Sequence, residues 1–67
     1  MYVVAIIGPS GMVRYLKNRK LFSCIEDAKW YNHPSSARKA RDGFMKKFGH
    51  MCIAQIFDAR DPDRVVE

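Results

Sequence analysis

The chain has 67 residues, enough for one small domain, and 48% of them are hydrophobic while 28% are charged. This composition is typical of a globular protein and excludes a disordered chain. The formal net charge is +5 at pH 7 and is unevenly placed: positions 14–47 hold ten basic residues and three acids, whereas positions 58–67 hold four acids and two arginines. A basic body favours a polyanionic partner, either nucleic acid or an acidic protein face, although a charge of this size also serves solubility.

The first half of the chain alternates strand and turn patterns. Tyr2–Ile7 is rich in β-branched residues and predicts a buried strand. Residues 8–11, Gly-Pro-Ser-Gly, predict a tight turn, and residues 12–17 alternate between two faces with the period of a strand. Together these segments predict a β-hairpin.

The next segment is irregular. Residues 18–20 predict a second polar turn, and residues 21–24 predict a short third strand. Ser23 has Glu26 three residues after it, the spacing of a capping box, so we expect a brief helical turn capped by Ser23. Residues 29–31 are expected to be extended.

The clearest pattern in the chain is an amphipathic helix from Pro34 or Ser35 to Phe48. Its apolar stripe consists of Ala37, Ala40, Phe44 and Phe48, while Lys39, Asp42 and Lys46 are expected on the opposite side. Gly43 costs about 1 kcal/mol of helix propensity, so either something packs closely there or the cost is tolerated. Gly49 predicts a left-handed residue just past the helix end.

Residues 51–57 predict a closing strand, and the order β-β-(β)-α-β follows. We therefore expect an α+β fold: one domain over residues 1–57, with an antiparallel sheet of three or four strands and one helix on one face. Residues 58–67 are expected to form a polar acidic tail without regular structure, because Pro62 disfavours a strand.

The predicted core draws on every element. Its members are Val4, Ile6, Phe22, Trp30, Ala37, Ala40, Phe44, Phe48, Ile53 and Ile56. One helix covers only one sheet face, so we also expect a homodimer, formed through the uncovered face or through an open strand edge.

The motifs for phosphate binding, metal binding and catalysis are all incomplete in this sequence. The Gly8–Gly11 segment follows a strand, but the lysine and hydroxyl residue of a phosphate-binding loop are missing after it. Cys24, His33, His50 and Cys52 have the chemistry of zinc ligands without the spacing of a known zinc motif. With no paired nucleophile and base either, we expect a non-enzyme without cofactor or metal.

The chain shows no cationic leader and no apolar run of membrane-spanning length. We therefore expect a cytoplasmic protein that does not associate with membranes. The two cysteines are then expected to be reduced, although neighbouring strands would also allow a Cys24–Cys52 disulfide.

Basic residues provide the strongest functional signal. They surround the second turn and line the helix, and the predicted partner-binding set is Arg14, Lys17, Arg19, Lys20, Arg38, Lys39, Arg41, Lys46 and Lys47. Tyr15, Trp30 and Tyr31 lie nearby in the sequence and could stack on bases, or could serve as core aromatics instead.

Several short runs carry a resemblance. These are Tyr15-Leu16, Leu21-Phe22-Ser23, Asp27-Ala28-Lys29 with Tyr31, and the helical alanines Ala37 and Ala40. In this order they resemble small orphan proteins encoded by bacteriophages and related mobile elements, which combine a hairpin, a helix and a closing strand. The resemblance implies a non-catalytic binder, such as an inhibitor or modulator of a protein in the host cytoplasm. Its partner would be an acidic protein surface or, as the alternative, nucleic acid contacted through the same basic residues.

Overall fold

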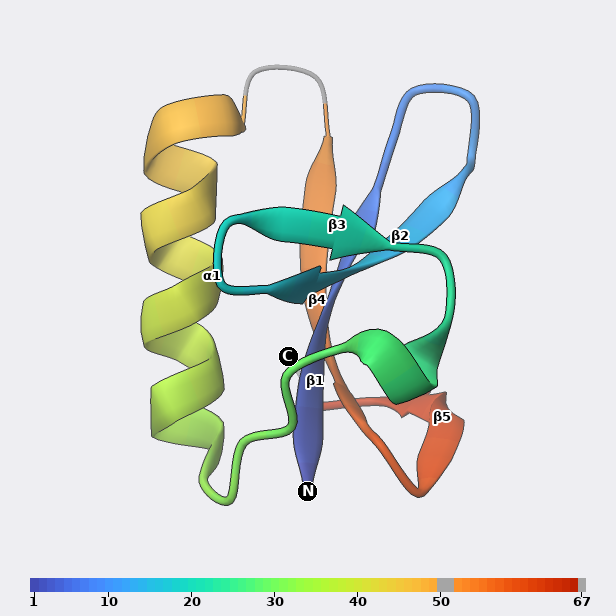
Figure 1. The fold of residues 1–67 in the computed structure, drawn as a ribbon, viewed down its shortest axis with the longest axis vertical. Helices are drawn as coiled ribbons and strands as arrows, with labels where there is room; N and C mark the ends of the chain where they lie inside the picture. The colour runs from blue at the N-terminus through green and yellow to red at the C-terminus, as the bar shows by residue number, and fades with distance from the viewer. Residues whose placement is uncertain (50–51, 67) are drawn as a thin grey trace.

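The chain folds into one five-stranded antiparallel sheet and one α-helix, in a computed structural model that describes residues 1–49 and 52–66 except the side chains of residues 62 and 63 (Figure 1). The strand order is β3-β2-β1-β4-β5. The elements are β1 (Tyr2–Ile7), β2 (Val13–Lys17), β3 (Lys20–Phe22), the short 3-10 helix η1 (Ile25–Asp27), α1 (Pro34–Phe48), β4 (Ile53–Asp58) and β5 (Asp61–Val65). The α+β prediction is confirmed, and the sheet has one strand more than the predicted maximum.

The centre of the sheet is β1, which pairs with β2 on one side and β4 on the other. Val3, Val4, Ala5 and Ile6 are all buried, so both faces of this strand are covered for most of its length. That explains why Tyr2–Ile7 is a continuous apolar run rather than an alternating one. The predicted turn after it is also confirmed: Gly8 and Gly11 close it by a hydrogen bond from the Gly11 amide to the Gly8 carbonyl, 3.0 Å long.

The helix packs on the sheet face that carries the main core. Val4, Ile6, Leu16 and Ile56 form this cluster with Ala37, which is fully buried where α1 meets the sheet. The missing side-chain bulk at Ala37 lets the helix lie close to the strands. The opposite face is covered in part by the segment around η1, where Ala28 packs with Val3 and Ala59.

Beyond η1 the second face stays open. Ile7 pairs with Val13 on one side and with Ile53 on the other, so these three aliphatic side chains form one row across the sheet. Val13 and Ile53 are exposed. This row is the uncovered face through which a homodimer was predicted, and the dimer stays a prediction.

The assignment of three residues to the core is wrong. Trp30, Phe48 and Ile53 are 40%, 55% and 60% exposed. Ile53 lies on the uncovered face, three residues from the buried Ile56. The Trp30 indole donates a hydrogen bond to the Ile25 carbonyl, 3.1 Å away, which fixes the ring against the surface of the η1 segment. Phe22, Ala40 and Phe44 are half-buried, and the other four predicted core residues are buried.

The prediction of an irregular C-terminal tail is also wrong. Residues 61–65 form β5, an edge strand that pairs with β4 through Phe57–Val65 and Asp58–Asp61 and includes a register shift. An edge strand needs only one side of its backbone for pairing, so it tolerates Pro62. The Ala59 amide donates to the Met1 carbonyl, 2.8 Å away, and ties this hairpin to the start of the chain.

Local caps differ from the expected ones as well. Cys24 rather than Ser23 precedes η1, and no side chain caps it. The helix begins at Pro34 as expected, with Gly49 at its C-terminal cap. Gly49 has φ −78° instead of a left-handed value, and glycine suits it for another reason: an added Cβ would collide with the Met45 carbonyl oxygen.

The burial of Tyr31 predicts that the stability of the fold depends on pH. Tyr2 and Tyr31 exchange two backbone hydrogen bonds of 2.8 Å, and burial raises the pKa of the Tyr31 phenol above its usual value. A group whose pKa is higher in the folded state stabilises the fold fully below its unfolded pKa, and this contribution is lost as the pH rises through the folded pKa. Tyr31→Phe is therefore expected to reduce the loss of stability above about pH 10, measured by thermal melts. Parallel stability curves for both proteins would contradict this assignment.

Candidate functional site

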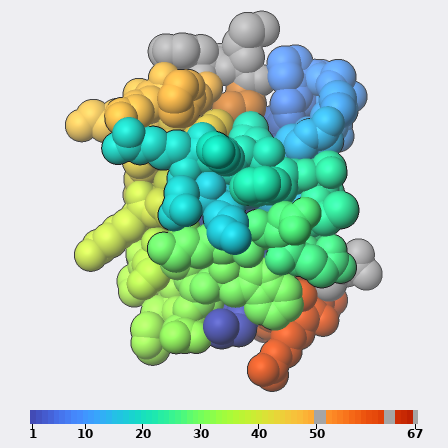
Figure 2. Space-filling view, in the orientation of Figure 1, coloured from blue at the N-terminus to red at the C-terminus, as the bar shows by residue number. Residues whose placement is uncertain are grey.

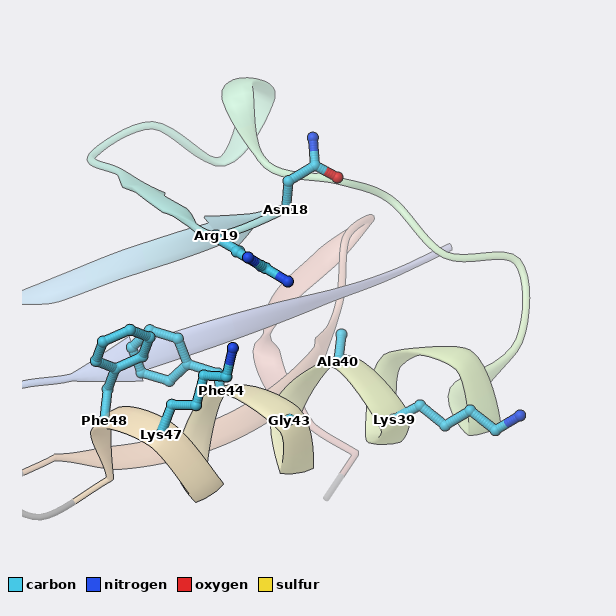
Figure 3. Close-up of a pocket in the computed structure, with 8 residues that line it drawn as sticks. All are labelled: Asn18, Arg19, Lys39, Ala40, Gly43, Phe44, Lys47 and Phe48. Atoms are coloured by element: carbon cyan, nitrogen blue, oxygen red, sulfur yellow. The ribbon is translucent and has the colours of Figure 1, made fainter.

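The tip of the β2–β3 hairpin reaches the side of α1 (Figure 1). Lys17 pairs with Lys20, so the connection has only two residues, Asn18 and Arg19. Asn18 has φ 58°, in the left-handed region, which asparagine tolerates better than most residues. This tight turn holds Arg19 at the tip, and Figure 3 shows its guanidinium group pointing toward the helix.

A groove of about 240 Å³ lies between this turn and the helix (Figure 3). Its lining residues are Asn18 and Arg19 from the turn and Lys39, Ala40, Gly43, Phe44, Lys47 and Phe48 from α1. We call it the basic groove. Figure 2 shows the atoms of the turn lying against those of the second half of the helix on one face of the molecule.

Helical spacing explains which side chains enter the groove. Lys39, Gly43 and Lys47 are four residues apart, so they form one line along α1 beside the line of Ala40, Phe44 and Phe48. The prediction that Lys39 lies opposite the apolar stripe is wrong, because it flanks that stripe on the side facing the hairpin. In Figure 3 its side chain extends along the helix, away from the two phenylalanine rings, whereas Lys47 points toward the turn.

One wall of the groove is aromatic. The ring centroids of Phe44 and Phe48 are 5.2 Å apart with an interplanar angle of 42°. This tilted arrangement is within the favourable range for aromatic pairs. Because Phe48 is more than half exposed, an apolar surface lies directly beside the cations of the groove.

The groove is strongly positive. No acidic residue lines it, and across residues 1–49 and 52–66 none of Arg19, Lys39 and Lys47 forms an ion pair. Like charges that are not neutralised within the chain repel one another and attract an anion.

A second, more open hollow of about 450 Å³ lies on the other side of the same turn. It is lined by Lys17, Asn18, Arg19, Lys20 and Phe22. Lys17 and Lys20 face each other across the hairpin, an arrangement that destabilises a sheet slightly. Arg19 and Asn18 belong to both hollows, so the turn carries cations on both of its sides.

Five of the nine predicted binding residues thus gather at the hairpin tip and the adjacent helix line: Lys17, Arg19, Lys20, Lys39 and Lys47. The other four line neither hollow. Arg41 is largely buried, with its Nε atom 3.1 Å from the Asp42 carboxylate. Arg14 donates to the Val13 carbonyl, 3.2 Å away, and Arg38 and Lys46 lie on other parts of the helix surface.

Four of the acids lie at a different part of the molecule. Glu26 and Asp27 belong to η1, and Asp58 and Asp61 pair across the β4–β5 hairpin. Figure 1 places both of these elements away from the tip of the β2–β3 turn. These four acids therefore lie away from the basic groove, whereas Asp42 lies on α1 beside Gly43 and pairs with Arg41.

Sequence reasoning did not identify Asn18, Ala40, Gly43, Phe44 and Phe48 as groove residues. The two phenylalanines were assigned to the core because they share the helical stripe of Ala37. A signal was present at Gly43, a poor helix former in the middle of a well-defined helix. For Phe48, its place in the last turn of the helix was the only hint that the sheet does not reach it.

Other chemistry finds no support in the described part of the chain. There, no three residues among His, Cys, Asp and Glu come together as a metal site, while His50 of the weak zinc set lies outside the described residues. Cys24 and Cys52 are both free thiols. Among these residues no helix has the length and apolar character to cross a membrane.

Comparisons with known proteins add no assignment. No family model matches the chain, and neither the curated proteins nor the solved structures contain a significant match. The resemblance to small phage proteins therefore stays a prediction.

Proposed function

We propose that this protein is a non-catalytic binding protein that captures an acidic segment of a partner protein in the basic groove. The resemblance to phage proteins extends the proposal: the partner is a host protein in the cytoplasm, and binding inhibits or modulates it. The observation that carries the proposal is the meeting of cations from two distant segments, residues 18–19 and 39–47, around one apolar groove.

Charge complementarity supports an anionic partner. Arg19, Lys39 and Lys47 have no acidic neighbour in the groove lining, so each can pair with a carboxylate of the partner. Binding would also relieve the repulsion between these cations. Electrostatic complementarity of this kind raises the association rate and selects against basic partners.

The size and walls of the groove favour a protein segment. Sites for drug-sized ligands usually measure about 300–1,000 Å³, and this groove is smaller. Its apolar wall is formed by the rings of Phe44 and Phe48, which offer a contact surface to an apolar side chain of the partner. An acidic segment with one apolar residue therefore matches both the charge and the shape.

Single-stranded nucleic acid is the second candidate. The specific observation that favours it is the exposed ring of Phe48 beside Lys47, because bases stack on aromatic rings while lysines contact phosphates. Such binding loses affinity steeply as salt increases, since each phosphate contact releases counterions.

An affinity pull-down with and without nuclease separates the two candidates. We expect the immobilised protein to retain a stoichiometric partner protein after nuclease treatment, and Arg19→Glu to lose it. In parallel, short single-stranded DNA and RNA are titrated at several salt concentrations. Tight, salt-sensitive binding of these strands with no retained protein would support the nucleic-acid proposal and contradict the acidic-partner proposal. If the protein retains no partner and binds no strand, both proposals are overturned.

A further inference from the structure

We infer that the partner's apolar side chain rests directly on the helix backbone at Gly43, which makes Gly43 the residue that determines specificity in the basic groove. This inference rests on the proposed function and names the feature of the acidic segment that the groove selects. Glycine at this position weakens the helix, and the inference gives it a role as a contact surface for the partner.

Nothing within the described chain requires glycine at this position. Gly43 lies inside the fifteen-residue helix α1 with ordinary helical geometry, so no left-handed backbone calls for it. A Cβ built on Gly43 would meet no atom within 4 Å, so no close packing calls for it either. Gly49 is different, because a Cβ there would collide with Met45. Glycine at position 43 therefore lowers helix stability, and no contact within the described chain compensates for this loss.

Gly43 forms the floor of the basic groove, and the space above it is open. Ala40 and Phe44 lie next to it on the helix, and Arg19 approaches from the opposite side (Figure 3). The glycine leaves a bare stretch of helix that a side chain from outside can approach closely.

Charges around this floor define the rest of the occupant. Lys39 and Lys47 lie one helical turn before and one after Gly43. In Figure 3 Arg19 and Lys47 point into the space between the turn and the helix, whereas Lys39 extends along the helix away from the turn. An apolar residue flanked by carboxylates on both sides therefore places its neutral side chain on Gly43 and its charges on Arg19 and Lys47, with Lys39 one turn away along the helix. A basic or neutral segment would not supply the carboxylates that pair with these cations.

Two peptides test the inference by fluorescence anisotropy at low salt. One has three glutamates on each side of a central phenylalanine, and the other has alanine in place of the phenylalanine. The wild-type protein is expected to bind the phenylalanine peptide about tenfold more tightly, because burying an aromatic side chain stabilises the complex. Gly43→Leu is expected to abolish this preference and Gly43→Ala to reduce it.

Stability measurements exclude a trivial loss of folding. Gly43→Ala is expected to raise the melting temperature by about 4–8 °C, because alanine is the better helix former and meets no obstruction. The matched control is Ser36→Ala, a substitution on the same helix outside the groove, which should leave the preference for the phenylalanine peptide unchanged.

The possible outcomes separate this inference from the proposed function. If both peptides bind equally and the Gly43 variants behave like wild type, the inference is overturned while the acidic-partner proposal stands. If neither peptide binds but an oligothymidylate does, the acidic-partner proposal fails and the inference fails with it. A preference that is lost in Gly43→Leu, in a protein that melts no lower than wild type, supports both.

Discussion

Replacing Ile56 with alanine is expected to lower the free energy of unfolding by about 2–5 kcal/mol. Ile56 lies on β4 and is fully buried against Val4, Leu16 and the helix residue Ala37. Truncation removes apolar contacts on the strand and under the helix at once, and leaves a cavity that a sheet cannot easily close. A small domain has a total stability of only about 5–15 kcal/mol, so this single change removes a large part of it.

The same strand supplies a matched control. Ile53 is 60% exposed on the uncovered sheet face, so Ile53→Ala should change stability by less than about 0.5 kcal/mol. Urea denaturation followed by circular dichroism measures both variants. Equal losses for the two would mean that both faces of β4 are buried to the same extent, and the assignment of the core to one face would be wrong.

The second large effect is expected on binding. Lys47→Glu replaces an attractive charge of the basic groove with a repulsive one, next to the Phe48 ring and opposite Arg19. A charge pair at about 4 Å contributes roughly 1 kcal/mol in water and more near a protein surface. Reversal removes one such attraction and adds a repulsion, so affinity for an acidic peptide should fall by about 10–100-fold.

Lys46 provides the control for this variant. It is the neighbouring residue on α1 and does not line the groove, so Lys46→Glu changes the net charge equally at a different place. Its affinity loss should be small and should disappear in about 0.15 M salt, where charges more than about 8 Å apart are screened. If both variants lose affinity to the same extent, binding depends on net charge and not on the groove.

Short-range patterns were sufficient for most of the secondary structure. The β-branched run at Tyr2–Ile7 and the helix between Pro34 and Gly49 were both predicted within one residue of their observed bounds. Each of these elements is specified by residues close together in the chain, through β propensity, helical periodicity and terminal glycine or proline.

Strand β5 shows where local patterns fail. A proline and four acids predict irregular structure for residues 58–67, yet β4 supplies a partner whose backbone groups pair with residues 61–65. The pairing energy comes from another part of the chain, so it cannot be recognised from the composition of the segment itself.

Burial of the large side chains depends on tertiary structure in the same way. Phe44 and Phe48 continue the apolar stripe of Ala37, and the sequence alone predicts one buried face. Ala37 is fully buried in the core, Ala40 and Phe44 pack against it, and Phe48 at the end of the stripe is more than half exposed. What remains uncovered becomes the apolar wall of the basic groove.

The sequence by itself determined the α+β class, the limits of β1 and α1, and the presence of a basic helix and a basic turn. Only the tertiary structure decided that Arg19 lines one groove with Lys39, Gly43 and Lys47. The reason is physical. Local propensities act between residues a few positions apart, whereas the meeting of two segments twenty or more residues apart depends on strand order and on which sheet face the helix covers.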